Sequence, residues 1–290
     1  MPLYRHLDFI RTFPTRVVSL VPSMTGSMFD LGMGQHLVGI TDDCVYPKLE
    51  TAKIPKIGGT KDFDVGKIIG LNPDLVIANQ EENTRAGIED LARNADVWLV
   101  FPQSVRAALD DLWDLVHLYG NGHSFMRIRT METAVEFAEM ALVDHTPQRV
   151  FIPIWLGSHR GQTWWMTFNG HTYAGDVVRL LGAVNIFHNR DRKYPLDADL
   201  GMAESEEPGD RDIRYPCVPS QEIVAARPEI IFLPSEPYLF SEKEKNFLAA
   251  ELSETPAVQN ENVIRMDGSL ITWHGTWIGK ALAELGGLIL

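Results

Sequence analysis

The sequence predicts an α/β fold made of two Rossmann-like lobes with mainly parallel sheets, joined by one long inter-lobe helix. Three observations support this. Short β-branched runs alternate with helical segments in both halves, an uninterrupted helical pattern lies between the halves, and a segment of the first half recurs in the second. Strands that alternate with helices are typical of parallel sheets.

The first third of the chain predicts one lobe. A β-branched run from Arg16 is stopped by Pro22-Ser23, which is typical of a buried strand. Further strands are expected at 37–41, 75–78 and 97–100, and helices at 24–31, 64–69 and 88–93.

The middle of the chain predicts the long helix. From Phe125 to Leu142 there is no Gly or Pro, and apolar residues such as Ile128, Met131 and Val135 recur at helical spacing. We therefore expect an N-terminal lobe over 1–122, an inter-lobe helix over 123–146 and a C-terminal lobe over 147–290.

After Pro147 the alternation of strands and helices begins again. Strands are expected at 149–155, 230–233 and 263–266, helices at 173–181, 222–226 and 277–285, and a polar irregular stretch at 189–216.

An internal repeat supports two similar lobes. Residues 68–77 align without gaps with residues 223–232. Both segments contain a short helix, a Pro that cannot continue it, an acidic residue and a buried strand. The same register places Glu81 opposite Glu236. Duplication of one α/β lobe is the simplest explanation.

Composition limits the possible partners. Among 290 residues, 45% are hydrophobic and 22% charged, which is typical of a folded protein. The net charge of −13 disfavours nucleic acid and anionic membranes as partners.

The charged opening residues do not form an export signal, and no run reaches the ~20 apolar residues of a membrane helix, so we expect no membrane insertion. As written, the chain is expected in the cytoplasm. Cys44 and Cys217 could be unpaired or form a disulfide.

Several motifs carry a family resemblance. They are Val17–Thr25, Leu31–Gly34, Leu37–Thr41, Tyr46-Pro47, Ile57–Lys61, Leu71–Ile77, Arg227–Leu233 and Ser235–Pro237. In this order and spacing, the chain resembles the helical-backbone metal receptors, the class III periplasmic substrate-binding proteins of ABC importers for cobalamin, siderophores and haem.

The resemblance implies a transport protein that binds a metal-containing organic ligand in a two-lobe cleft, and not an enzyme. A cobalamin-like corrinoid is the first expectation, because the region from Asp42 to Tyr46 resembles the cobalamin branch; a ferric siderophore or haem follows. The resemblance also implies docking to an ABC permease through Glu81 or Glu82 and Glu236, and a periplasmic or cell-surface location. No prosthetic group is expected.

Ligands of α/β sheets bind beyond the carboxyl ends of the strands, and this rule selects the candidate residues. In the first lobe they are Ser23, Met24, Asp42, Tyr46, Gly59, Thr60 and Asn79; in the second they are Trp155, Ser235, Trp273 and His274. Trp165 is added because the second lobe is rich in aromatic residues. The tryptophans suit stacking on a flat macrocycle.

His274 is the best single candidate for an axial ligand to a metal carried by the ligand, and a hydrogen-bonded loop histidine is the alternative. The sequence has no spacing typical of a structural zinc site. It also lacks a GxSxG elbow, a P-loop and a GxGxxG after the first strand, so we expect no catalytic residues. A cytoplasmic carrier or sensor of the same ligand, or an enzyme acting on it, are the alternatives.

Overall fold

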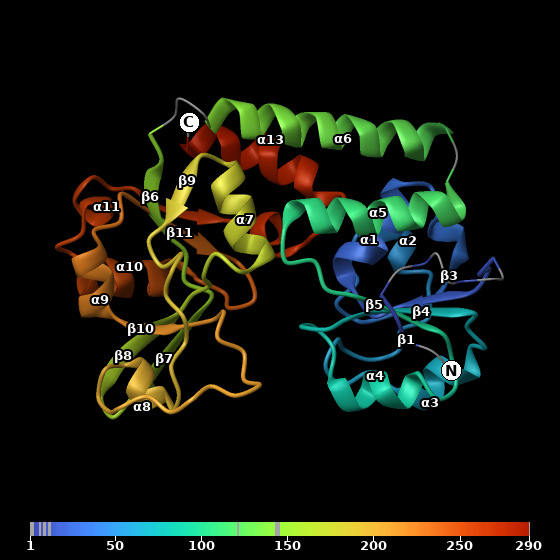
Figure 1. The fold of residues 1–290 in the computed structure, drawn as a ribbon, viewed down its shortest axis with the longest axis horizontal. Helices are drawn as coiled ribbons and strands as arrows, with labels where there is room; N and C mark the ends of the chain where they lie inside the picture. Colours follow the sequence, from blue (N-terminus) through green and yellow to red (C-terminus); the bar gives the residue numbers. More distant parts are fainter. Residues whose placement is uncertain are drawn as a thin grey trace. The chain divides into compact units, whose positions relative to one another are not determined.

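The computed structural model describes residues 3–5, 7, 10, 13–120, 122–142 and 146–289. The chain forms an α/β fold with two compact units (Figure 1). Unit 1 comprises Met1–Ala134 and Trp273–Gly279, and unit 2 comprises Val135–Thr272 and Lys280–Leu290. Residues 273–279 thus pack with unit 1, although the sequence places them within the C-terminal lobe.

Unit 1 is built on a five-stranded sheet in the order β1-β5-β4-β2-β3, in which every neighbouring pair is parallel. The strands are β1 (Leu3–Tyr4), β2 (Val17–Ser19), β3 (Leu37–Ile40), β4 (Leu75–Asn79) and β5 (Val97–Val100). The helices are α1 (Pro22–Asp30), η2 (Gly34–His36), α2 (Lys48–Thr51), α3 (Val65–Gly70), α4 (Arg85–Leu91) and α5 (Val105–Tyr119). The four strands expected in this lobe are confirmed.

Side chains of the central strands alternate between the two faces of this sheet. Val18, Val76 and Val97 pack with Ile68 of α3 and Ile88 of α4 in one core cluster. Figure 1 shows α3 and α4 on this face, with α1 and α5 on the opposite face. Both faces are therefore covered, which is why the strands are continuous apolar runs.

The sequence analysis did not identify α5. Its start is capped by the side chain of Ser104, whose Oγ accepts a hydrogen bond from the N–H of Ala107 (3.1 Å). Its buried residues are Val105, Ala108, Leu109, Leu112, Leu115 and Val116, which form a regular helical stripe.

Unit 2 contains a four-stranded parallel sheet in the order β12-β11-β6-β9 and a three-stranded antiparallel sheet in the order β10-β8-β7. The strands are β6 (Gln148–Phe151), β7 (Trp155–His159), β8 (Gln162–Met166), β9 (Ala183–Asn185), β10 (Cys217–Pro219), β11 (Ile230–Pro234) and β12 (Val263–Met266). The helices are α7 (Tyr173–Leu180), α8 (Leu196–Asp199), α9 (Ser220–Ala226), α10 (Glu242–Glu251), α11 (Pro256–Gln259) and α12 (Ser269–Thr272).

The single strand expected over 149–155 is wrong in its second half. β6 ends at Phe151 and Pro153 follows, so Trp155 begins a separate strand, β7. β7 and β8 form a hairpin whose turn residues Arg160 and Gly161 both have positive φ (50° and 80°). Two such residues are typical of a type I′ turn.

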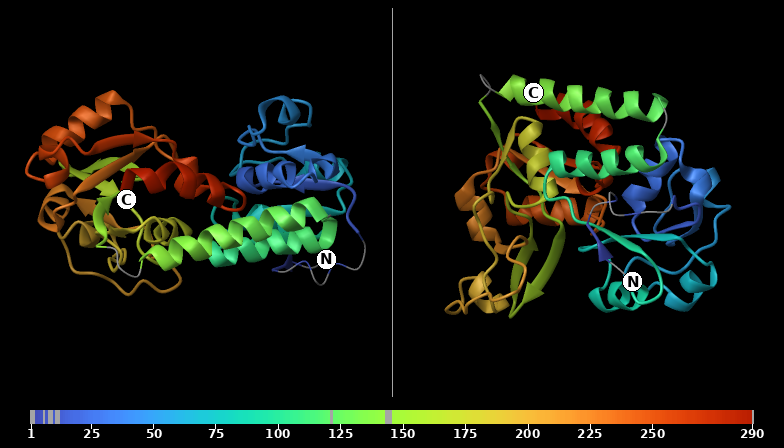
Figure 2. Two further views of the ribbon diagram at one scale, coloured as in Figure 1. Left: turned by 90° about the horizontal axis from the view of Figure 1, so that it is seen from above. Right: turned by 45° about the vertical axis from the view of Figure 1, so that its right-hand side comes forward.

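Two helices cross the division between the units. α6 (Gly122–Ala141) confirms the long helix (Figure 2). Its residues Ile128, Met131 and Val135 are buried, as the spacing predicts. The expected continuation over 143–145 lies outside the described residues. The other helix is α13 (Trp277–Ile289).

The internal repeat is visible in the backbone. α3 and β4 correspond to α9 and β11, and Asn72 and Arg227, at equivalent positions of the alignment, both have φ of 47°. Left-handed conformation is uncommon outside glycine, so its recurrence at one aligned position supports duplication.

The repeat extends to an arginine clamp, defined here as Arg16 in unit 1 and Arg149 in unit 2. Each arginine lies at the start of a strand that neighbours the repeated one, Arg16 just before β2 and Arg149 second in β6. Each donates from Nη2 to the end of the repeated helix, to Leu71 O (2.6 Å) and to Ala226 O (2.5 Å) respectively. The acidic residue of each repeat, Asp74 or Glu229, accepts a hydrogen bond from the backbone N–H of its arginine (3.0 and 2.9 Å).

The irregular stretch of unit 2 is ordered by a buried carboxylate. The side chain of Asp199 is inaccessible to solvent and accepts hydrogen bonds from Arg190 Nη1 (2.8 Å), Lys193 N (2.9 Å) and Cys217 N (2.6 Å). Cys217 and Cys44 are both buried free thiols.

Candidate functional site

The loops at the carboxyl ends of the unit 1 strands are held together by two asparagines, Asn79 and Asn83. Asn79 Oδ1 accepts hydrogen bonds from the backbone N–H groups of Glu81 (2.7 Å) and Glu82 (3.3 Å). Asn83 Oδ1 accepts from Asn79 N (2.7 Å), and its Nδ2 donates to Thr60 O (2.9 Å). Both amides are buried, so the loop that carries Glu81 and Glu82 has a fixed backbone.

The ring of His274, the expected axial ligand, is buried and lies beside Asn79. The ring is 3% exposed, and its Nε2 lies 3.2 Å from Asn79 Nδ2. Because Asn79 Oδ1 already accepts two N–H groups, Nδ2 must be the donor, so Nε2 accepts and Nδ1 carries the proton. Burial lowers the pKa of His274 to about 4, so the ring is neutral near pH 7.

The segment 273–279 attaches to α1 by hydrogen bonds. Thr276 N donates to Ser27 Oγ (3.0 Å), and Thr276 Oγ1 donates to Asp30 Oδ2 (2.8 Å). Trp277 packs directly over Gly26, where a Cβ would lie 2.5 Å from the indole ring. Only glycine allows this approach, so the position of the tryptophan depends on Gly26.

Three aromatic side chains gather around this attachment, and we name them the unit 1 aromatic group: Tyr46, Trp273 and Trp277. The ring centroids of Trp277 lie 4.7 Å from those of both Tyr46 and Trp273. Tyr46 and Trp273 are half-buried, while Trp277 is buried. Burial and the neighbouring Asp30 raise the pKa of Tyr46, so its phenol is neutral at physiological pH.

Two of the other unit 1 candidates are not accessible. α1 begins at Pro22, and a proline is well suited to the first turn of a helix. Ser23 and Met24 therefore belong to the helix and are buried rather than exposed in a loop. The hydroxyl of Ser23 makes no hydrogen bond to any described residue.

Asp42, Gly59 and Thr60 do lie at the surface. Asp42 is exposed, whereas Gly59 and Thr60 are half-buried. Asp42 N donates to Gly58 O (2.8 Å), and Thr60 N donates to Asp43 Oδ2 (2.9 Å). These bonds join the loop after β3 to the loop before α3.

In unit 2, the loop after β11 is fixed by side-chain hydrogen bonds. Ser235 Oγ accepts from Gly268 N (3.1 Å), and Glu236 Oε1 accepts from Thr272 Oγ1 (2.9 Å). A Cβ at Gly268 would lie 2.5 Å from Glu236 O, so the two loops are in direct contact. Glu236 is half-buried, as are Glu81 and Glu82.

The tryptophans of unit 2 divide into exposed and core side chains. Trp155 is 46% exposed, with its ring edge to face with Tyr238 at 5.3 Å between centroids. Trp165 is fully buried against Phe240, with Nε1 bonded to Ser220 Oγ (3.3 Å), so it serves the core and we remove it from the ligand-binding candidates. Trp164, on the other face of β8, is half-buried over Gly157.

Sequence reasoning missed Asn83 and Trp277 as organisers of the site. Both depend on partners distant in the sequence, Thr60 and Gly26. The sequence signal for Asn83 was its position four residues after Asn79, just beyond the strand predicted at 75–78.

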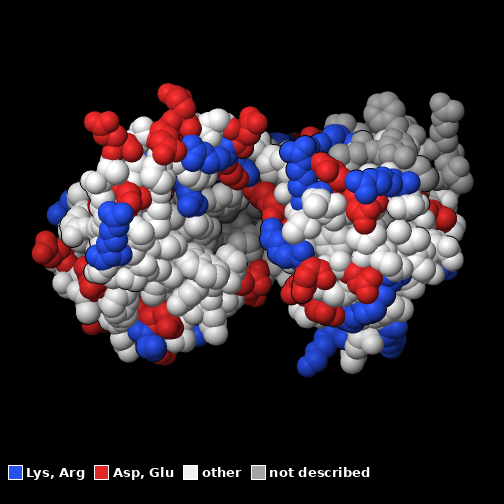
Figure 3. All heavy atoms as spheres, turned by 90° about the horizontal axis from the view of Figure 1, so that it is seen from below, with Lys and Arg blue, Asp and Glu red and all other residues white. Residues whose placement is uncertain are grey.

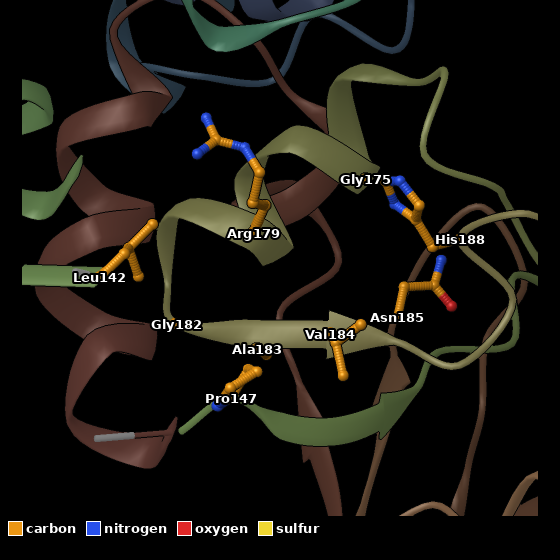
Figure 4. Close-up of a pocket in the computed structure, with 9 residues that line it drawn as sticks. All are labelled: Leu142, Pro147, Gly175, Arg179, Gly182, Ala183, Val184, Asn185 and His188. Atoms are coloured by element: carbon orange, nitrogen blue, oxygen red, sulfur yellow. The ribbon is translucent and has the colours of Figure 1, made fainter. Parts of the chain in front are cut away.

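A pocket of about 280 Å³ lies along β9, the edge strand of the parallel sheet in unit 2 (Figure 4). Its lining residues are Leu142, Pro147, Gly175, Arg179, Gly182, Ala183, Val184, Asn185 and His188. The cation Arg179 already pairs with Asp176 (2.9 Å), and Asn185 donates to Phe168 O (2.6 Å). The pocket contains none of the candidate residues, and we do not place the function there.

The charged groups are mixed on the surface. On the face shown in Figure 3, acidic and basic side chains are interspersed and form no continuous basic area. Within the described part of the chain, no three His, Cys, Asp or Glu side chains are placed to hold a metal ion. None of the helices formed by the described residues has the length and apolar character needed to cross a membrane.

Relatives of known structure share this fold. The haem-binding protein RhuT of Roseiflexus sp. RS-1 superposes with a TM-score of 0.72 at 20% identity, over 93% of this chain and 96% of its own. The vitamin B12-binding protein BtuF of Vibrio cholerae gives a TM-score of 0.73 at 19% identity, over 95% and 96% of the two chains.

Sequence comparison identifies the family. The chain is 28% identical over 201 residues to the vitamin B12-binding protein of Pectobacterium atrosepticum, which is 63% of this chain and 65% of that relative's length. The family profile described as "Periplasmic binding protein" matches residues 17–270. Because that match includes most of the chain, the protein belongs to the periplasmic binding protein family.

Proposed function

We propose that this chain is a substrate-binding protein that reversibly binds a metal-containing organic ligand and delivers it to an ABC permease. A cobalamin-like corrinoid is the first candidate, and a ferric siderophore or haem follows. Relatives named vitamin B12-binding and haem-binding proteins support this class of ligand. The observation that carries the proposal is the presence of accessible aromatic rings beside strand ends in each unit.

In the proposed complex, the ligand stacks on aromatic rings at strand-end loops. Trp155 and Tyr238 present aromatic surface in unit 2, and Tyr46 and Trp273 do so in unit 1. Stacking on a flat macrocycle contributes about 0.5–1.5 kcal/mol for each ring pair beyond the burial of area. The loops after β4 and β11 are fixed by the Asn79, Asn83 and Ser235 hydrogen bonds, so little ordering of these two loops is required on binding.

Recognition in this proposal depends on the organic part of the ligand. His274 is engaged by Asn79, and the proposal assigns it the role of supporting the loop rather than of a metal ligand. Asp42, Gly59, Thr60 and Ser235 provide polar groups at the loop surface, which suits the amide or carboxylate substituents of such ligands.

The proposed permease contacts are Glu81 or Glu82 in unit 1 and Glu236 in unit 2. Aligned residues Glu81 and Glu236 each follow a repeated strand, on loops with fixed backbones. Carboxylates held in this way are suited to paired hydrogen bonds with arginines of a partner, which would determine the docking orientation.

The first experiment is tryptophan fluorescence quenching with cobalamin, cobinamide, haemin and a panel of ferric siderophores. We expect saturable quenching at micromolar or tighter affinity by one of these ligands. Replacing Trp155 by Ala should weaken binding about 2- to 10-fold, the range that stacking energies of 0.5–1.5 kcal/mol imply.

The matched control is Trp165→Phe, which removes a buried indole from the same sheet and should leave the affinity unchanged. No saturable response to any ligand would overturn the proposal, whether the protein is regarded as an importer receptor or as a cytoplasmic carrier or sensor. Turnover of a bound ligand would instead favour an enzyme.

A further inference from the structure

The long helix α6 carries apolar side chains on two opposite faces. Its inner face is buried through Ile128, Met131 and Val135. On the outer face, Met126, Phe137 and Met140 are 62%, 65% and 68% exposed. Exposed apolar side chains that gather on one face of a helix make that face a candidate interaction surface.

The outer residues follow a regular spacing. We define the outer seam as Met126, Thr130, Thr133, Phe137 and Met140, all of which are exposed. The intervals between them are four, three, four and three residues, which is the alternation of core positions in a coiled coil. Such a seam lies on one side of the helix and fits the seam of another helix.

Charges beside the seam determine the orientation of a partner helix. Arg129 and Glu136 are exposed, one heptad apart, on the same side of the seam. When two copies of α6 pair antiparallel, Arg129 of each copy faces Glu136 of the other, and Met126 packs beside Phe137. In a parallel pair the same two side chains would face Ala134 and Ala141, without charge complementarity.

Both charged groups can make this contact. Arg129 pairs with Glu132 of its own helix (2.6 Å), but a guanidinium has five N–H donors and can bind a second carboxylate. Glu136 has no ion pair with any described residue. The seam is thus complementary to a reversed copy of itself.

We infer that the outer seam of α6 is a self-association surface, through which two copies of this chain form an antiparallel helix pair. The seam spans only about 21 Å at 1.5 Å per residue, and two threonines occupy its centre. The dimer should therefore be weak, with a dissociation constant in the micromolar range or above, as expected for a small interface. This inference is independent of the proposed ligand.

Sedimentation velocity over a range of protein concentrations tests the surface. We expect reversible dimerisation of the full chain, and its loss when Phe137 and Met140 are both replaced by Glu. The matched control is Leu49→Glu on α2, because Leu49 is 74% exposed but lies outside the seam. A chain that remains monomeric at several hundred micromolar would overturn the inference.

Charge reversal tests the orientation. Arg129→Glu and Glu136→Arg should each weaken the dimer, and the double variant should restore it because each new charge again faces its opposite. Circular dichroism of the variants separates this effect from any change in the helix itself. Failure of the double variant to recover would rule out the antiparallel pairing.

Engineered cysteines provide a second readout. In the antiparallel register Thr130 lies opposite Thr133 of the other copy, so a mixture of Thr130→Cys and Thr133→Cys chains should oxidise to a mixed disulfide dimer. Each variant alone should cross-link less, since identical positions are displaced along the helix axis. The two native thiols are buried and should not compete. Preferential cross-linking of identical chains would indicate a parallel pair and overturn the proposal.

Discussion

The side chain of Asn79 connects three parts of unit 1. Its Oδ1 accepts hydrogen bonds from the backbone of Glu81 and Glu82, and its Nδ2 donates to His274. The backbone N–H of Asn79 donates to Asn83 Oδ1. A buried polar network of this kind is stable only when its members are satisfied together. Changes at His274 should therefore affect folding more directly than ligand chemistry.

The buried imidazole predicts a defined pH dependence. Burial lowers the pKa of His274 from 6.5 to about 4, so the folded protein binds fewer protons than the unfolded chain between these values. Stability is unaffected above pH 6.5 and is lost as the pH falls toward 4, by about 3 kcal/mol in total. Urea unfolding at pH 7 and pH 4.5 should show this loss, and His274→Gln should reduce it. An unchanged pH profile in the variant would contradict the assignment.

At the level of elements, the arginine clamp makes the two lobes comparable. Arg16 and Arg149 each bond to the end of a repeated helix, where carbonyl groups otherwise lack partners. The clamp fixes the turn between α3 and β4 in unit 1 and between α9 and β11 in unit 2. Its presence in both units supports the duplication of one ancestral lobe.

Removal of the clamp should cost stability in each unit. Arg16→Ala and Arg149→Ala should each lower the free energy of unfolding by about 1 kcal/mol, the usual contribution of hydrogen bonds of this kind. The losses should add in the double variant because the sites lie in different units. Urea denaturation measures this, with Arg93→Ala as a control that removes an exposed ion pair with Asp90. A loss in the control equal to that at the clamp would show that the clamp has no special role.

The elements that the sequence predicted well are those with local signals. The strands at 75–78 and 230–233 are short apolar runs after a Pro, and the long helix has no Gly or Pro. The split between β6 and β7 was missed because the apolar run continues past Pro153, and only its pairing with β8 distinguishes Trp155. The burial of Trp165, Ser23 and Met24 was missed because burial depends on tertiary packing rather than on local pattern.

For the whole molecule, the family and the fold class followed from the order of many weak motifs, each of which is uninformative alone. The ligand did not, because a binding surface depends on side chains that tertiary packing brings together, as it brings Trp155 to Tyr238. The permease contacts remain a prediction based on the aligned pair Glu81 and Glu236.

The predicted permease contacts can be tested with variants that separate ligand binding from ligand delivery. The double variant Glu81→Lys, Glu236→Lys should bind ligand with unchanged affinity, since ligand stacking is assigned to other residues. It should fail to support ligand uptake in a strain whose importer depends on this receptor, because reversed charges repel the arginines of the permease. The control is Asp90→Lys, which reverses a charge on α4 and not on the loops that carry Glu81 and Glu236. Normal uptake by the double variant would exclude these carboxylates as docking groups.

The placement of residues 273–279 in unit 1 has a consequence for how the protein is made. The hydrogen bonds from Thr276 to Ser27 and Asp30, and the packing of Trp277 over Gly26, can form only after residues 276 and 277 have left the ribosome. Domains usually fold one after another from the N-terminus during synthesis. Here the first lobe to be translated is expected to wait for residues 273–279, which follow the strands of the second lobe in the sequence.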